Sequence, residues 1–417
     1  MIHCFSNKFP GVLTMKMSLK KIKLTAWGWM MALILLLTLI ILHSVSGTPA
    51  FAPSAYNSYT LQALAWRRGL PYLQQDVPHL ELAIKDGLYF VSFPPVPSIP
   101  LYFLSFIFGD HTPDGLLVKL YALIAYLATY RAFRHKGRQD IYAALCSFLL
   151  CAASSMLPLL LSGAVWYQAQ VMAFMFTVLA VSGMFARHYT SALLCYALSI
   201  GCRPFNVIYG ILLMYIFLIN MRSSVKPGLK PAVRSILPGI ILGLCVAGGY
   251  AWYNFVRFGS PFEFGHNYLP EFSFQGGKQF SLAHIQKNAA TFILGLPYEE
   301  GKDGLTLRIF GFSLFIANPA LLLMIILFCA DVIKRRAGAY EALIIMLFVP
   351  HLLLLLSHRT FGGFQFGARY AVDLIPYAFA YLAGRELPRA WKKPCLLVML
   401  AGLAFSIFGS LMIRLPG

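Results

Sequence analysis

Long apolar runs separated by short polar segments make up most of the chain. A helix needs about 20 apolar residues to cross a hydrocarbon core of about 30 Å, and most of the runs approach that length. The expected spans are residues 24–45, 114–133, 140–161, 169–186, 191–202, 205–221, 235–253, 309–330, 341–357, 371–384 and 395–413. The pattern therefore predicts an all-α polytopic membrane protein with about 11 transmembrane helices, in which residues 1–417 form a single transmembrane domain.

Two shorter helices are expected outside this set. Residues 98–109 are apolar but too few to cross the membrane at about 1.5 Å per residue. We expect them to form a re-entrant or juxtamembrane helix that begins after a Pro-Pro-Val-Pro run, because proline cannot continue a helix. Residues 55–68 have the spacing of an amphipathic interfacial helix with Leu61, Leu64 and Ala65 on its apolar face.

The composition narrows the class of protein further. Hydrophobic residues make up 59% of the chain and charged residues only 12%, whereas soluble domains carry about 25% charged residues. This excludes a soluble enzyme, a disordered chain and a nucleic-acid-binding domain. A β-barrel is disfavoured because its strands alternate between apolar and polar residues.

The distribution of charge predicts the topology. The net charge of +19 comes from 34 Lys and Arg against 15 Asp and Glu. Six segments expected in the cytoplasm hold 21 of the 34 basic residues and only four acids: 1–23, 131–140, 187–190, 222–235, 331–341 and 385–394. The positive-inside rule therefore places the N-terminus in the cytoplasm. The first apolar run is long for the core of a cleaved signal peptide, so we interpret it as an anchor.

Polar residues gather in loops on the opposite side of the membrane. Two of these extracytoplasmic loops are long, 46–97 and 254–308, and a third, 358–370, is short. The second loop alternates aromatic residues with polar ones, namely Asn254, Arg257, Glu263, His266, Asn267 and Tyr268. Such a pattern is typical of either an aromatic membrane belt or a sugar-binding surface.

Acids and arginines of these loops are the candidates for chemistry. A carboxylate beside the membrane can act as a general base on an acceptor hydroxyl, and the first loop offers Asp76, Glu81 and Asp86. The alternative is that all three are solvated loop acids. Arginines near the outer face either extend to lipid phosphates or bind a specific phosphate, and the candidates are Arg203, Arg257, Arg359 and Arg369. The eight cysteines show no metal-ligand spacing, and we assign no metal ligands.

Three segments resemble bacterial polytopic glycosyltransferases of the GT-C superfamily. They are Tyr253-Asn254 with Arg257-Phe258-Gly259-Ser260-Pro261 and Phe264-Gly265, then Gly363-Phe364-Gln365-Phe366-Gly367-Ala368-Arg369-Tyr370 with Asp373 and Pro376, and the stretch from Glu81 to Pro97. The combination is similar to polyprenyl-phosphate-sugar-dependent enzymes related to the protein mannosyltransferase and aminoarabinose transferase group. The resemblance implies an integral protein of the bacterial cytoplasmic membrane with an extracytoplasmic active site.

The resemblance also implies an activity and its residues. Such enzymes transfer a sugar from a polyprenyl phosphate to a lipid, glycan or protein acceptor, with an acid of the first loop as the catalytic residue. Glu81 matches the family acid best, and Asp76 and Asp86 stay alternatives. Many relatives carry an acid just after the first span, where the nearest equivalent here is Asn57.

The predicted binding residues follow from these segments. Arg369, Arg203, Arg257 and Arg359 are expected at the donor phosphate. The sugar or acceptor is expected to contact Asn57, Tyr89, Asn254, Glu263, His266, Asn267, Tyr268 and Gln365. A metal is not obligatory because the leaving lipid phosphate is already charged, although a Mg²⁺ or Mn²⁺ ion bridging acid and phosphate stays open. The other hypotheses are a transporter or flippase of lipid-linked saccharides and a non-catalytic scaffold. Under each hypothesis we expect the protein to contact membrane lipids and to bind no nucleic acid.

Overall fold

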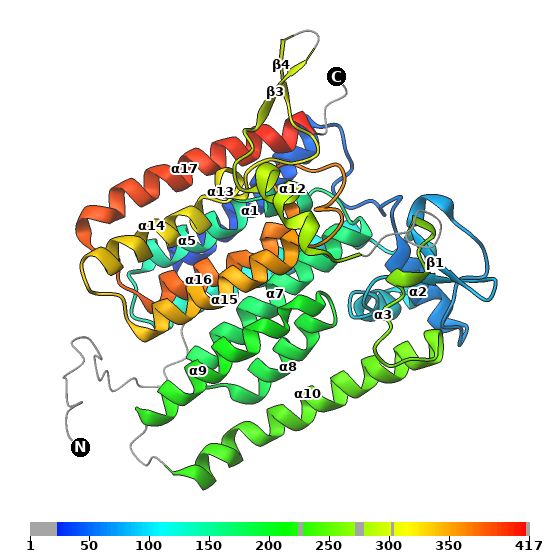
Figure 1. The fold of residues 1–417 in the computed structure, drawn as a ribbon, viewed down its shortest axis with the longest axis horizontal. Helices are drawn as coiled ribbons and strands as arrows, with labels where there is room; N and C mark the ends of the chain where they lie inside the picture. Colours follow the sequence, from blue (N-terminus) through cyan, green and yellow to red (C-terminus); the bar gives the residue numbers. More distant parts are fainter. Residues whose placement is uncertain (1–22, 224–227, 272–278, 302–303, 414–417) are drawn as a thin grey trace.

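The computed structural model describes residues 23–223, 228–271, 279–301 and 304–413. Most of them form a bundle of roughly parallel and antiparallel helices (Figure 1). The main helices are α1 (Ala26–Val45), α4 (Asp114–His135), α5 (Asp140–Ala152), α7 (Val165–Phe185), α8 (Tyr189–Ile200), α9 (Tyr209–Arg222), α10 (Leu229–Phe258), α14 (Pro319–Ile333), α15 (Ala339–Leu356), α16 (Ile375–Gly384) and α17 (Arg389–Met412).

Shorter elements connect these helices. The short α-helices are α2 (Ser58–Arg67), α3 (Ser98–Phe108), α6 (Met156–Leu159), α12 (Leu282–Phe292) and α13 (Leu314–Ala317). Single turns of 3₁₀ helix are η1 (Pro78–Leu80), η2 (Gly109–His111), η3 (Pro204–Ile208), η4 (His266–Tyr268) and η5 (Arg369–Leu374). The strands are β1 (Leu82–Lys85), β2 (Leu88–Val91), β3 (Tyr298–Gly301) and β4 (Gly304–Leu307), which form two antiparallel hairpins.

The helices confirm the predicted membrane architecture. Seven helices of the described chain are long and apolar enough to cross a membrane, and three further apolar helices of 10–17 residues accompany them. The exact number of 11 crossings stays a prediction. The small hairpins are the one departure from an all-α fold, and both lie in the loops that were expected outside the cytoplasm.

Three predicted spans differ from the helices that form. The run 140–161 is broken at Ser154, whose hydroxyl donates to the carbonyls of Leu150 and Cys151. Helix α10 extends over 30 residues because polar residues flank its apolar centre. Helix α14 begins only at Pro319, since the separate short helix α13 precedes it and Asn318 between the two is not helical. Hydropathy detects the apolar centre of a helix better than its polar ends.

Helix α7 lies at the centre of the bundle. It packs mainly against α4 and α8, and 78% of its apolar window is buried, against 11% for α10 at the edge (Figure 1). Gly183 of α7 and Ala192 of α8 allow these two helices to approach closely. A Cβ added to Gly183 would lie only 3.0 Å from the Ala192 Cβ, which is too close for an unstrained contact. Close backbone approach through small residues is the usual way in which membrane helices pack.

The first outer loop folds onto one end of the bundle. Helix α3 begins at Ser98, directly after the Pro-Pro-Val-Pro run, as predicted. Of the predicted apolar face of α2, Ala65 is buried and Leu61 is partly buried, and Tyr59 and Gln62 are buried as well. The reason is polar pairing, since the Ser98 hydroxyl donates to the Tyr59 carbonyl and to Gln62 Oε1.

Candidate active site

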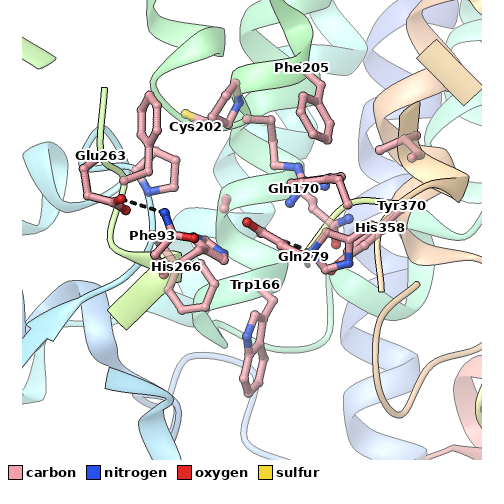
Figure 2. A pocket seen from close by; sticks show the side chains of 18 of the residues that line it. Phe93, Trp166, Gln170, Cys202, Phe205, Glu263, His266, Gln279, His358 and Tyr370 are labelled. Atoms are coloured by element: carbon pink, nitrogen blue, oxygen red, sulfur yellow. Dashed lines mark hydrogen bonds between the residues drawn. The ribbon is translucent and has the colours of Figure 1, made fainter. Parts of the chain in front are cut away.

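A cavity of about 330 Å³ lies at the end of the bundle that carries the outer loops. Figure 2 shows Phe93, Glu263 and His266 on one side and Gln279, His358 and Tyr370 on the other. Its walls come from α7, the turn after α8, and all three polar loops: Phe93, Pro94, Trp166, Ala169, Gln170, Cys202, Arg203, Pro204, Phe205, Phe262, Glu263, Phe264, His266, Asn267, Gln279, Phe280, Leu355, His358 and Tyr370. Such a mixture of aromatic walls with a few polar groups is typical of small-ligand sites.

Arg203 supplies a fixed positive charge in the cavity wall. It lies in the tight turn between α8 and η3, and Pro204 is the first residue of η3. Its Nε and Nη2 both lie 2.8 Å from Oδ2 of Asp373. The Asp373 side chain is only 1% exposed and that of Arg203 is 23% exposed. The buried carboxylate therefore orients the guanidinium while leaving part of it open to the cavity.

Arg369 lies close to Arg203 across the ring of Tyr370. The guanidinium carbons of Arg203 and Arg369 are 4.8 and 5.3 Å from the Tyr370 ring centroid, so the two charges are within about 10 Å of each other. Arg369 is buried, and its Nε has no hydrogen-bond partner among the described residues. Glycine at position 362 leaves room for the Arg369 side chain, because a Cβ on residue 362 would lie 2.5 Å from the Arg369 Nε. Two of the predicted phosphate-binding arginines are therefore brought together.

Trp166 connects the predicted catalytic acid with this arginine pair. Its indole Nε1 donates to Oε2 of Glu81 at 3.0 Å, and its ring lies 5.7 Å from the Arg369 guanidinium carbon. Glu81 adopts a left-handed conformation with φ of 52°. Such a backbone costs about 1 kcal/mol or more in a residue other than glycine and is frequent at functional sites.

The other two candidate acids occupy different positions. Asp86 forms the tip of the β1–β2 hairpin with Gly87, and both have positive φ, as a two-residue type I′ turn requires. Asp76 is exposed in the loop before η1. All three candidate acids are exposed and lie outside the cavity wall, but Glu81 is hydrogen-bonded to the wall residue Trp166.

Glu271 adds a second carboxylate near Glu81. Burial raises the pKa of Glu271, the negative charge of Glu81 raises it further, and the positive charge of Arg359 lowers it. These three side chains thus form one interacting group of charges beside the cavity. Arg359 also donates its backbone N–H to the Gln279 carbonyl, which holds the third loop against the second.

Imidazole, amide and carboxylate groups supply the other polar atoms of the wall. Burial lowers the pKa of His266 to about 4, and the same cause lowers the pKa of His358 to about 4. Both imidazoles are therefore neutral at pH 7. Glu263 is already engaged, because it accepts hydrogen bonds from the Gly265 backbone and the Asn267 amide at 2.7 Å. Neutral donors and acceptors of this kind suit the hydroxyl groups of a sugar.

Arg257 and Asn254 are buried outside the cavity wall. Arg257 donates to the Val91 carbonyl and to Asn254 Oδ1, and it lies between the rings of Tyr253 and Phe258. These contacts join the end of α10 to the end of β2. In this structure the pair fastens two outer elements together.

Four further predicted residues also lie outside the wall. Tyr268 stacks on Phe258. Asn57 precedes α2, and Tyr89 pairs within the hairpin. Gln365 accepts the backbone N–H of Arg369 and so positions that arginine.

Several wall residues were not among the predicted ones. They are chiefly Trp166, Gln170, Gln279 and Tyr370. Two glutamines at 168 and 170 inside an apolar span could have indicated α7, since polar groups within membrane helices are usually functional. Among the described residues, no three His, Cys, Asp or Glu side chains come together as a metal site.

Comparisons with known proteins place the fold. No protein-family model matches the sequence, and no curated protein matches it. The apo oligosaccharyltransferase of Archaeoglobus fulgidus has a similar structure, with a TM-score of 0.53, 13% identity, and coverage of 94% of this chain and 56% of that chain. ArnT of Cupriavidus metallidurans bound to undecaprenyl phosphate is similar with a TM-score of 0.52, 14% identity, and coverage of 91% and 64%.

The similarity extends over nearly the whole chain, although the chain spans only 56–64% of the length of these two structures. The chain therefore has the overall fold of these two structures, and its long apolar helices are those of an integral membrane protein.

Proposed function

We propose that this protein is a membrane glycosyltransferase that transfers a sugar from a polyprenyl-phosphate donor to an acceptor of the bacterial cell envelope. The acceptor is a lipid, a glycan or a protein, and the reaction takes place on the extracytoplasmic face of the cytoplasmic membrane. The two similar structures support this proposal, because one is an oligosaccharyltransferase and the other, ArnT, is bound to undecaprenyl phosphate.

The observation that carries the proposal is the arrangement around Trp166 and Tyr370. The guanidinium groups of Arg203 and Arg369 both contact the Tyr370 ring, and Trp166 contacts both Arg369 and the carboxylate of Glu81. A phosphate held by the arginines would place the attached sugar in the neutral part of the cavity. Glu81 would then lie on the acceptor side of that sugar.

The reaction that fits this arrangement is a direct displacement with inversion. The acceptor hydroxyl gives its proton to Glu81 while its oxygen forms a bond to the anomeric carbon. The bond between that carbon and the phosphate oxygen breaks, and the electron pair leaves with the polyprenyl phosphate. Arg203 and Arg369 stabilise the negative charge that develops there.

A transporter is less well supported. Ionisable groups of transporters lie deep within their spans, whereas the buried pair Asp331–Arg385 lies at the ends of α14 and α16. Lys119 lies in the second turn of α4. Among the described acids of the expected outer loops, by contrast, Glu263 lines the cavity and Glu81 is bonded to its wall residue Trp166.

Transfer of labelled sugar tests the proposal. Protein in lipid nanodiscs is given radiolabelled polyprenyl-phosphate sugars and a cell-envelope acceptor fraction, and label in the acceptor is counted. We expect Glu81→Gln to lower the rate at least about 100-fold, because general-base catalysis contributes about that much. Donor affinity should stay within about twofold, since Glu81 does not bind the phosphate.

Asp86→Asn and Asp76→Asn are matched controls, because each removes one exposed loop carboxylate without touching the cavity. Both should retain transfer close to the wild type. Equal activity of Glu81→Gln and the two controls would remove Glu81 from the mechanism, and absence of transfer by the wild-type protein with every donor would overturn the proposed function.

A further inference from the structure

A second hollow lies at the opposite end of α7 from the active-site cavity. Helix α7 has 21 residues and is therefore about 30 Å long. Its first turns line the active-site cavity, and its last turns, with Leu179, Ser182 and Gly183, line a groove of about 1000 Å³. We call this the distal groove; α1, α4 and α8 form its other walls.

The described lining of the distal groove carries positive charge and no acid. Lys23 and Arg131 contribute two cations, and His135 and His188 contribute two imidazoles. The side chains of Lys23, Arg131 and His188 are exposed. His135 is oriented by the bundle, since its Nε2 donates to the Phe185 carbonyl at 2.9 Å.

Neighbouring side chains strengthen this positive potential. The charges of Lys136 and Arg187 act on His135, and the Lys136 ammonium lies 4.2 Å from the Phe185 ring centroid. The nearby carboxylate of Asp140 is paired with Arg134 at 3.7 Å. No acid of the described lining offsets the positive charge of the groove.

One wall of the groove continues into a lipid-facing apolar surface. Trp29 of α1 lines the groove and is 63% exposed. Leu33, four residues later on the same helix face, is 56% exposed. A ligand in the groove can thus place an anionic head among the basic residues and an apolar tail along α1.

We propose that the distal groove binds an acidic phospholipid of the leaflet that meets the basic loops. Its phosphate would lie among Lys23, Arg131 and His188, because Lys and Arg attract phosphate near a membrane surface by about 1 kcal/mol each. Its acyl chains would follow Trp29 and Leu33. This site is independent of the sugar-transfer reaction.

Other occupants fit the groove less well. Residues 1–22 contain four lysines and no acid, so their charge has the same sign as that of the groove. Free phosphate would leave the apolar wall uncovered. An acidic lipid complements both the charge and the apolar surface.

Lipid-dependent stability and native mass spectrometry test the site. Wild-type protein in a neutral detergent is given phosphatidylglycerol, phosphatidylcholine or inorganic phosphate, and the melting temperature and bound lipids are measured. We expect phosphatidylglycerol to bind and stabilise, and the other two to have little effect. Lys23→Gln with Arg131→Gln should weaken phosphatidylglycerol binding about tenfold or more, since two charge contacts are lost.

Lys334→Gln with Arg336→Gln is the matched control. These two exposed basic residues follow α14, and their replacement changes the net charge by the same amount. The control should bind phosphatidylglycerol as the wild type does. Equal weakening in both double variants would overturn the proposed site and would indicate general attraction to the basic surface. Unchanged phosphatidylglycerol binding in Lys23→Gln with Arg131→Gln would also overturn the site. A phosphate effect equal to that of the lipid would overturn the role of the apolar wall.

Discussion

The pairing of Arg203 with Asp373 shows how one residue can serve both stability and binding. The two lie 170 positions apart in the chain, and the carboxylate is almost fully buried. A buried carboxylate is stable only with a partner. The same pairing fixes the direction in which the guanidinium meets the cavity, so the arginine is positioned before any phosphate arrives.

This double role leads to a prediction at the scale of the residue. Arg203→Gln leaves Asp373 without its cation and should destabilise the protein by about 3 kcal/mol. Adding Asp373→Asn should recover most of that loss, because the unpaired charge disappears. Donor binding should stay at least about tenfold weaker in both variants, since a charged hydrogen bond to phosphate is gone.

Thermal unfolding and donor titration measure the two effects separately. If the double variant regained donor affinity together with stability, Arg203 would have only a structural role.

The sequence predicted three charged site residues that the structure places near one another, Glu81, Arg203 and Arg369, and their roles stay predictions. Arg203 lines the cavity, and Trp166, another wall residue, contacts both Glu81 and Arg369. Trp166 could not be distinguished in this way, because an aromatic residue at the end of a span is normally part of a membrane belt.

At the scale of elements, the end of α10 and the β1–β2 hairpin are joined through Arg257. Two of its N–H groups donate to Val91 and Asn254 at 2.8 and 2.9 Å. A planar guanidinium can satisfy both acceptors while it stacks on rings, which a lysine cannot do. The connection holds the first and second outer loops together beside the cavity.

Arg257→Lys should therefore lower stability by about 1–2 kcal/mol, because one buried acceptor loses its partner. Donor affinity should change less than about twofold, since the charge is kept and the residue lies outside the cavity wall. Thermal unfolding and a donor titration check both expectations. A large loss of donor affinity with unchanged stability would instead place Arg257 at the phosphate.

At the scale of the whole molecule, the cavity is closed by segments from distant parts of the chain. His266 belongs to the second outer loop and His358 to the third, and the pKa of each is lowered by burial to about 4 from an ordinary value of 6.5. Both imidazoles must be neutral for the loops to pack in this way. Folding therefore depends on pH.

The direction of this dependence follows from proton binding. Between pH 6.5 and 4 the unfolded chain binds protons at these histidines and the folded chain does not, so stability falls as the pH decreases. We expect each histidine to contribute roughly 1–2 kcal/mol of loss between pH 7 and pH 5. Thermal unfolding across this pH range measures the slope, and His358→Gln should reduce it. An unchanged slope in that variant would assign the pH dependence to other groups.

The sequence by itself determined the membrane architecture, the elements near the outer surface and the residue types from which the site is built. Transfer of apolar side chains into lipid and the placement of basic loops depend on local composition, so both could be inferred residue by residue. Only the tertiary structure decided which charges meet. Glu81 and Trp166 are 85 positions apart and bond directly, whereas Arg257 turns away to join two loops. Packing between distant segments sets these distances, and a pattern along the chain contains no measure of them.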